Sequence, residues 1–365
     1  MSLDVAAGAI IAYRLFDVAY AIDLGKAEAN WARTVRTGIS RGRLTATPAK
    51  AVTFGVPPVE LTLDAVTLPL PAPFPVTATA RLYEFGAVSL ELHVPVADLG
   101  WAAFTQRLND IDRTVADSPL WGMLLGRVRD GVGDALVRPA GTFLEEDYLV
   151  GVVQAFSETL PAEALLQRLD LVPLLSGEVR PLSDAARADL LRHRYSFYVD
   201  DLVVLTWDRA FIYEPRGDSD VLDVLEVANA QLLEMRYYDE LLDGELPRMY
   251  DLVEAARRHR PLPGARRFAD LARRFYTLVA EVTELTEKVD NALQVTEDVY
   301  LARIYAAALE LFRVPTVSAA VSRKLSIIRD TYTALYDEAH SSRSEMLEIM
   351  VLVLIAVEIV VAVWR

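Results

Sequence analysis

The residues best suited to acid–base chemistry in this 365-residue chain are carboxylates that occur in three clusters. The clusters are Glu145-Glu146-Asp147, Asp200-Asp201, and the group of Asp218, Asp220 and Asp223. Paired carboxylates can serve as general acid and general base when burial separates their pKa values. The chain contains 52 acidic and 37 basic residues and carries a formal net charge of −15, so solvated loop charges are the more ordinary interpretation of these clusters.

Histidines and cysteines offer little further chemistry. His93, His193, His259 and His340 lie far apart and form no pattern with the spacing of metal ligands. The chain has no cysteine, which excludes disulfides, thiolate metal sites and cysteine nucleophiles. There is no phosphate-binding loop or serine elbow, and the segment GRVRDGVGDAL lacks the third glycine of a dinucleotide fingerprint. The sequence therefore indicates no catalytic residue, no metal and no cofactor, and it favours a non-enzymatic role.

Basic residues are concentrated in two places against this acidic background. One group contains Arg33, Arg36, Arg41, Arg43 and Lys50. Such groups can contact anionic lipid headgroups or RNA phosphates. Ion pairing with acids of neighbouring helices is the more ordinary alternative, and both interpretations stay open. The denser group, with which anionic contact is predicted, contains Arg257, Arg258, Arg260, Arg266, Arg267, Arg273 and Arg274.

The segment that decides where the protein works is residues 346–364, MLEIMVLVLIAVEIVVAVW. A helix of this length reaches roughly 28 Å, close to the thickness of one hydrocarbon core. Glu348 lies near its start and Glu358 near its middle, where a charge costs roughly 2.5–3.5 kcal/mol on insertion scales. Trp364 and Arg365 suit the membrane–water interface. We expect a transmembrane tail anchor, with a buried core helix or one helix of a bundle as the alternative.

The flanking charges and Glu358 predict the orientation and the association of this helix. Arg343 precedes the apolar run, with Arg323 and Lys324 further back, so the N-terminal body is expected on the cytoplasmic side of the inner (cytoplasmic) membrane. Glu358 needs a proton or a facing helix within lipid, which predicts a homo-oligomer. The residues expected to form the anchor and the self-association face are Met346, Ile349, Val353, Ala356, Glu358, Val360 and Trp364.

The chain before this helix divides into a strand-rich part and a helical part. Residues up to about 215 read as strands with a few helices. Strands are predicted within residues 5–24, 51–70, 78–94, 148–156 and 195–213. Gly86 marks a bulge or hairpin turn, the prolines of residues 69–75 mark a connector, and Asp98 is expected to cap a helix that follows it.

Residues from Val221 onward are almost entirely helical in pattern. Apolar residues follow four-three spacing from Leu271 to Ala292 and again from Leu325 to Ala339, on either side of a break at Pro315. This spacing predicts a helical hairpin or a coiled-coil seam, and ordinary helix packing is the alternative. The fold class is α+β, with a β-rich domain at 1–215, a helical domain at 216–345 and the transmembrane helix at 346–364.

Several segments together resemble one known family. His340-Ser341-Ser342-Arg343 and LIAVEIVVAV resemble the ending of the "required for meiotic nuclear division" family, a domain of unknown function. The segments ALELFRVPTVSAAVSRKLSII, LLEMRYYDELLD and LYEFGAVSLEL also resemble parts of that family. The resemblance covers residues 78–365 and is strongest in the last seventy. Arg323 stands where the family commonly has asparagine.

The resemblance implies a location and a partner rather than a reaction. Eukaryotic members of that family sit in the mitochondrial inner membrane, self-associate and support mitochondrial translation. No catalytic residues are established for them, so none carries over. The resemblance implies an anchor with a juxtamembrane segment at 340–343 and a role in recruiting ribosomes or RNA.

We therefore expect a membrane-anchored, self-associating scaffold or binding protein without intrinsic catalysis. Its expected partners are membrane lipid, a second copy of itself, and the ribosome or RNA. One alternative is an enzyme whose site lies in the β-rich half, in a deep pocket lined by Asp200, Asp201 or His193. The other is a soluble oligomer sealed by its C-terminal helices.

Overall fold

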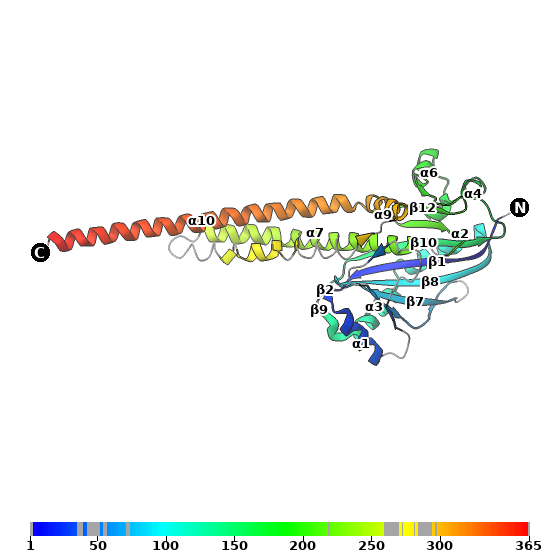
Figure 1. Cartoon of the computed structure of the whole chain (residues 1–365), viewed down its shortest axis with the longest axis horizontal. Helices are drawn as coiled ribbons and strands as arrows, with labels where there is room; N and C mark the ends of the chain where they lie inside the picture. Colours follow the sequence, from blue (N-terminus) through cyan, green and yellow to red (C-terminus); the bar gives the residue numbers. More distant parts are fainter. Residues whose placement is uncertain are drawn as a thin grey trace. The chain divides into compact units, whose positions relative to one another are not determined.

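The computed structural model shows two compact units (Figure 1). Unit 1 comprises Met1–Glu234 and Lys288–Pro315, and unit 2 comprises Met235–Glu287 and Thr316–Arg365. The three-segment division predicted from the sequence stays a prediction. The structure describes residues 3–34, 39–41, 52–53, 57–70, 74–217, 220–258, 270–271, 273–280, 282–283, 294–295 and 298–363.

Unit 1 contains a sheet of ten described strands in which nearly all neighbours are antiparallel and only β10 and β13 are parallel. In spatial order the strands are β11 (His193–Tyr195), β12 (Leu202–Leu205), β13 (Arg209–Tyr213), β10 (Glu145–Phe156), β1 (Asp4–Asp17), β8 (Ala87–Gly100), β7 (Phe74–Leu82), β5 (Val59–Thr62) and β3 (Ile39–Arg41), with β6 (Val66–Leu68) beside β7. Two smaller pairs are β2 (Ala19–Ile22) with β9 (Leu136–Pro139), and β4 (Val52–Thr53) with β14 (Gln294–Val295). Strand β11 is therefore an edge of the large sheet among the described strands.

Helices connect and cover these strands. In chain order they are α1 (Leu24–Thr34), α2 (Trp101–Val115), α3 (Pro119–Val132), the 3-10 turn η1 (Gly133–Ala135), α4 (Ala162–Arg168), α5 (Val172–Ser176), α6 (Asp184–Leu190), α7 (Val221–Arg258), α9 (Val299–Leu311) and α10 (Val314–Val363). Local sequence explains several of their starts. Ser118 caps α3 by accepting from the Leu120 N–H, and Pro119 occupies the first turn, where its missing N–H costs nothing.

The two faces of the sheet differ in character because side chains alternate along each strand. On one face Ile10 of β1 and Leu92 of β8 are fully buried in the main apolar core together with Phe104 of α2. The opposite face carries polar residues in register, since Tyr13 of β1 pairs with Glu91 of β8. This second face is buried as well, since Ile11 and Tyr13 are each 3 % exposed, and it has its own polar network, described below.

Gly86 explains how β7 turns into β8. It has a φ of +107°, and a Cβ there would lie 1.8 Å from the Ala19 carbonyl oxygen. Only glycine combines that backbone conformation with so close an approach. The predicted hairpin at this position is confirmed.

Two local predictions were wrong. Asp98 does not cap α2, because it lies within β8 with a φ of +50°, and Gly100 occupies the cap position. The proline-rich segment is not a connector throughout, because β7 begins at Phe74 and includes Pro75. Pro75 is tolerated since it pairs with the short outer strand β6, away from the central ladder.

Unit 2 is helical wherever it is described. Leu271, Phe275 and Val282 of the first predicted four-three repeat are buried, as are Ile328 and Leu335 of the second, on α10. The Lys324 ammonium on α10 makes contacts of 2.7 Å with the carboxylates of two α7 residues, Asp239 and Asp243. The α+β fold with a β-rich first half and a helical second half is confirmed.

The structure describes only part of the predicted transmembrane helix. The α10 backbone is helical to Val363, but most side chains of 338–363, and Trp364 and Arg365, lie outside the described residues. Among the described residues, no single helix has the length and hydropathy of a membrane span. The consecutive helices Val299–Leu311 and Val314–Asp337 pass that test only when taken together.

Candidate binding surface

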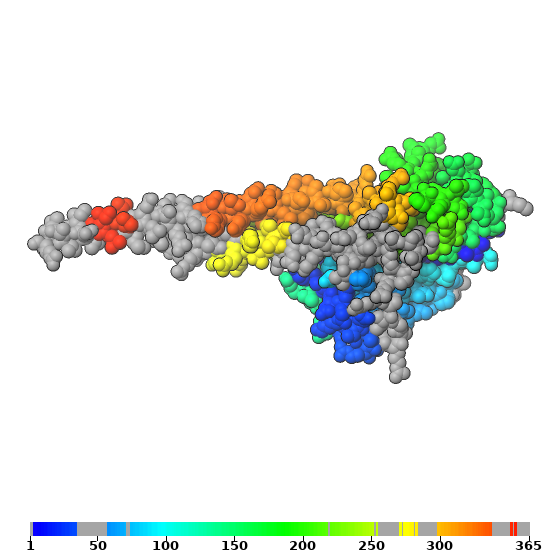
Figure 2. Space-filling model, in the orientation of Figure 1, coloured from blue at the N-terminus to red at the C-terminus, as the bar shows by residue number. Residues whose placement is uncertain are grey.

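A short loop beside the sheet edge holds large apolar side chains in solvent. Residues 196–201, which we call the aromatic loop, connect β11 to β12. Within it Phe197 is 61 % exposed and Val199 is 76 % exposed, and Tyr198 is also exposed. In the space-filling view the green segments around this loop form part of the outer surface of unit 1 (Figure 2). Such exposure is unusual for side chains of this size and needs an explanation.

Hydrogen bonds fix the aromatic loop in this conformation. The buried carboxylate of Asp201 accepts from the Phe197 N–H at 2.7 Å and from the Tyr198 N–H at 3.1 Å. The Ser196 hydroxyl donates to the Tyr198 carbonyl at 2.5 Å, and the Val199 carbonyl accepts from the Ala162 N–H at 2.9 Å. The exposed side chains are therefore presented by a well-tied backbone rather than by a loose one.

A cavity of about 370 Å³ opens next to this loop. Its lining joins the start of α4 to the edge strand β11. We call it the β11 groove; it is lined by Pro161, Ala162, Glu163, Leu166, Arg194, Tyr195, Ser196, Val199 and Leu202. Burial raises the pKa of the Tyr195 hydroxyl, so this ring stays neutral at physiological pH.

Arginines and further aromatic rings surround the groove. The Arg216 guanidinium lies 3.9 Å from the ring centroid of Tyr198, and that of Arg303 lies 5.8 Å from the ring of Tyr195. The ring of Phe197 is tilted against Tyr300 of α9, with 5.4 Å between centroids. Aromatic and guanidinium groups in contact are the composition that dominates protein-binding surfaces.

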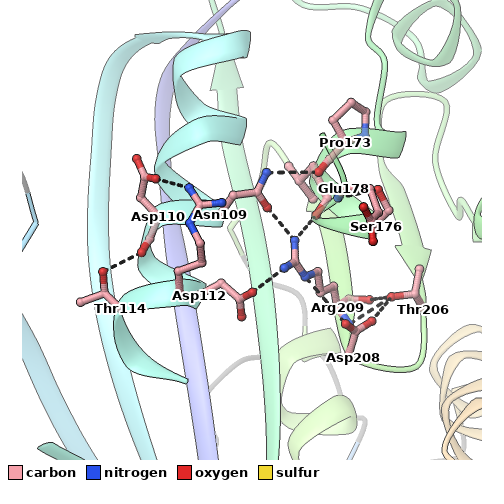
Figure 3. Close-up of polar contacts among 12 residues, drawn as sticks. Asn109, Asp110, Asp112, Thr114, Pro173, Ser176, Glu178, Thr206, Asp208 and Arg209 are labelled. Carbon is pink, nitrogen blue, oxygen red and sulfur yellow. Dashed lines mark hydrogen bonds and ion pairs between the residues drawn. The ribbon is translucent and has the colours of Figure 1, made fainter. Parts of the chain in front are cut away.

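A buried arginine holds the neighbouring strand β13 in place. Figure 3 shows the Arg209 guanidinium between α2 and α5. It donates to Asn109 Oδ1 at 2.7 Å, to the Leu174 carbonyl at 2.9 Å and to Asp112 Oδ2 at 2.5 Å. The Arg209 side chain is 7 % exposed, so this network is structural. It holds β13 in place, and β12 and β11 follow β13 in the sheet.

A second buried network lies on the polar face of the sheet. Arg81 of β7 contacts Asp223 at 2.9 Å and also Glu226, both on α7, and Tyr83 donates to Glu226 at 2.8 Å. Burial raises the pKa of Glu226 although Arg81 opposes the effect. Burial, and next the charge of Glu226, raises the pKa of the nearby Glu91 to about 7. The network ties α7 to the sheet inside unit 1 and borders no described cavity.

A second hollow, of about 510 Å³, lies beside α3 and offers less to a ligand. Gly122, Gly126 and Gly131 contribute no side chain, and the Arg127 guanidinium already contacts Asp64 at 2.5 Å. The β11 groove is the better candidate because apolar and cationic groups converge on it.

Of the acidic residues singled out from the sequence, Asp218 lies outside the described residues, and Glu145 contacts Arg14 at 3.6 Å. Asp201 is buried but is used to tie the aromatic loop, and neither Asp200 nor His193 lines the β11 groove. Asp223 pairs with Arg81. Among the described residues no group of three or more metal-ligating side chains occurs.

The predicted basic and membrane residues are only partly described. Arg273 and Arg274 are exposed, Arg257 and Arg258 belong to the α7 backbone, and Arg260, Arg266 and Arg267 lie outside the described residues. The juxtamembrane residues His340, Ser341, Ser342 and Arg343 belong to α10 with side chains outside the description, as do Met346, Ile349, Val353, Ala356, Glu358 and Val360.

The sequence does not reveal the β11 groove, because SFYV reads as the apolar interior of a strand. The available signal was the Asp200-Asp201 pair directly after this run, since an aspartate at that offset can accept from backbone N–H groups of a turn. The contribution of α4 could not be read locally, because it comes from residues about thirty positions earlier in the chain.

The fold defines an α+β protein with a large, mostly antiparallel sheet followed by long helices. The chain belongs to the family described as "Uncharacterized protein MJ0711, N-terminal domain", whose model matches residues 7–220. A curated relative, "Uncharacterized protein MJ0711" of Methanocaldococcus jannaschii, is 23 % identical over 193 residues, covering 53 % of this chain and 58 % of the relative. The chain thus matches less than two thirds of the length of that relative. No solved structure matches.

The predicted resemblance to the meiotic nuclear division family was wrong, because the matching family is a different one. The strongest similarity to that family lay in the last seventy residues, outside the matched range 7–220. Apolar helices built from Leu, Ile, Val and Ala resemble one another by composition alone, which explains the error. The matched range does contain every lining residue of the β11 groove.

Proposed function

We propose that the protein is a membrane-tethered binding scaffold without intrinsic catalysis. In this proposal unit 1 holds a partner and the apolar end of α10 attaches the chain to a bilayer, with unit 1 on the cytoplasmic side of the cytoplasmic membrane. The observation that carries the proposal is the exposure of Val351, Leu352, Leu354 and Ile355 on α10, between 46 % and 64 %. Exposed aliphatic side chains at adjacent positions require a cover of lipid or protein.

The arrangement of these four residues supports lipid over a single partner helix. At about 100° per residue they project over roughly 160° of the helix circumference. A coiled-coil seam is a narrower stripe, whereas a bilayer covers a helix from all sides. The apolar sequence 346–364 extends the same character beyond the described side chains.

Vesicle flotation tests the tether. The full chain is compared with a variant that ends at Ser344, using vesicles of neutral and of anionic lipid. We expect the full chain to float and the shortened chain to remain in solution. If both remain in solution and the full chain alone forms oligomers, the helix belongs to a sealed bundle and the tether is excluded.

Self-association is a separate part of the proposal and rests on Glu358 in the apolar run. A carboxylate at that depth is stabilised by a facing helix or a proton. Glu358→Leu is expected to reduce the oligomer size in detergent, measured by light scattering. An unchanged oligomer size would exclude a role of this residue in association.

Recruitment of ribosomes or RNA is a separate part of the proposal, and the family resemblance does not support it. Its remaining support is the exposure of Arg273 and Arg274. Ribosome co-sedimentation at low and high salt, with the pair changed to glutamate, tests it. If ribosome binding is equally strong in the variant, or equally strong at low and high salt, phosphate contacts are excluded.

A further inference from the structure

We propose that the β11 groove binds an acidic segment of a protein partner, which inserts one bulky apolar side chain into the cavity. This inference rests on the proposed binding role of unit 1 and names the partner chemistry. It does not depend on membrane attachment. The groove, the aromatic loop and the surrounding arginines carry it together.

The aromatic loop supplies rigid apolar contacts. Phe197, Tyr198 and Val199 are exposed while the backbone between them is fixed by the Asp201 carboxylate and by Ala162. A loop whose backbone is already ordered loses little entropy when a partner covers it. Aromatic residues on ordered loops are typical anchors of binding surfaces. The core of unit 1 gains nothing from this exposure, so a partner explains it best.

The cavity limits the size of the inserted group. Its volume of about 370 Å³ lies near the lower end of the roughly 300–1,000 Å³ typical of ligand pockets. The buried side chains of Ala162 and Leu202, with Leu166, give it apolar walls. These dimensions suit one bulky side chain and its neighbours on a peptide rather than a large cofactor.

The charges around the groove select an acidic partner. Arg194, Arg216 and Arg303 are exposed and, among the described residues, none of them has a carboxylate within ion-pair distance. Nearby arginines of unit 1 are paired: Arg168 with Glu158, Arg187 with Asp170 and Arg192 with Asp189. Only Glu163 contributes a carboxylate to the lining. Complementary charges across an interface favour carboxylates on the partner.

The same surface is poorly suited to RNA. The rings of Phe197 and Tyr198 are nearly perpendicular, at 89°, so they do not form a continuous stacking platform for bases. A protein segment is therefore the occupant that the geometry favours.

Selection from a display library of short random peptides tests the inference on the full chain held in detergent. We expect enriched peptides to carry a Phe, Trp or Leu flanked by Asp and Glu. Arg194→Glu is expected to weaken them about tenfold or more and to shift a fresh selection toward Lys and Arg. Phe197→Ala is expected to weaken them by a similar factor without changing the charge preference.

Arg33→Glu is the matched control, because Arg33 is an exposed arginine on α1, remote from α4 in Figure 1. It should leave peptide affinity within about twofold of the unmodified chain. Peptides that bind Arg194→Glu and Phe197→Ala as tightly as the unmodified chain would overturn the inference. So would binding of polyuridylate that requires Arg194 when no acidic peptide is enriched. Vesicle flotation reports separately on the tether, so failure of either proposal is distinguishable.

Discussion

Two arginines of unit 1 lie two strands apart in the sheet and behave in opposite ways. Arg209 of β13 is buried and donates to Asn109, to Asp112 and to a backbone carbonyl. Arg194 of β11, two strands away, is exposed and lines an apolar cavity with no ion-pair partner among the described residues. The first set of contacts is complete within the chain, whereas the second has unused hydrogen-bonding capacity.

The difference separates stability from recognition. A buried guanidinium must have all its partners nearby, because leaving a charge unpaired in the interior is expensive. An exposed guanidinium on an apolar rim costs little while water solvates it, and it becomes useful when a partner displaces that water. Substitutions at the buried arginines should therefore change folding, and substitutions at the groove should change binding.

The largest effect on stability is expected at Arg81, where one guanidinium faces Asp223, Glu226 and Glu60. Arg81→Leu leaves Glu226, which is 2 % exposed, without its cation, and we expect a loss of roughly 3–5 kcal/mol in the free energy of unfolding. Urea unfolding of the full chain measures it. The double variant Arg81→Leu, Glu226→Leu should recover part of the loss, and no recovery would show that the pairing is not the cause.

A smaller loss is expected at Arg209. Arg209→Met removes the contact to Asp112, whose side chain is 36 % exposed and can be partly rehydrated, so roughly 2–4 kcal/mol is expected. Arg113→Ala is the control, because Arg113 lies next to Asp112 on α2 and its pair with Asp110 lies at the surface. That control should change the free energy of unfolding by less than about 0.5 kcal/mol. Similar losses in both variants would contradict the distinction between buried and exposed arginines.

The polar face of the sheet predicts a pH dependence. The pKa of Glu91 is raised from 4.5 to about 7 in the folded protein. Between these two pH values the folded state therefore keeps a proton that the unfolded chain has lost. This group therefore stabilises folding less as pH rises from about 4.5 to 7, and the decline ends above that range. Asp17, raised to about 7 by burial, acts in the same direction.

Glu91→Gln should flatten the decline in unfolding free energy between pH 5 and 7, measured by urea titrations at several pH values. Asp17→Asn should remove a separate part of it. Glu91 faces Glu226, Glu60, Asp223 and Arg81, so the change at Glu91 depends on that network being intact. A slope identical to that of the unmodified chain in both variants would exclude these two carboxyls as its source.

Local sequence predicted the elements more fully than it predicted the two arginine sites. The apolar pattern of residues 195–213 predicted the strands that lie there, β12 and β13, and Gly86 predicted the β7–β8 turn, because both signals are contained within a few residues. The Arg209–Asn109 contact joins residues 100 positions apart. Only the strand order brings them together, and no periodicity within either segment encodes it.

The groove was hidden for a related reason. Whether Phe197 is buried or exposed depends on hydrogen bonds to Asp201 and on α4, not on the identity of Phe197. Asp201 was interpreted as half of an acidic pair, whereas its role is to accept from two backbone N–H groups. The sequence therefore shows which apolar and acidic residues lie in this region, but not that the apolar ones are exposed and Asp201 ties the loop.

The smallest effect on stability, and the sharpest contrast with Arg209, is expected at Val199. Its side chain is 76 % exposed, and the contact that orders the loop there is made by its carbonyl, which Val199→Ala keeps. The free energy of unfolding should change by less than about 0.5 kcal/mol. Affinity for the acidic peptides should fall several-fold, because Val199 lines the groove. A loss of stability comparable to that of Arg209→Met would show that the exposed loop serves folding after all, and the separation between the two arginine sites would not hold.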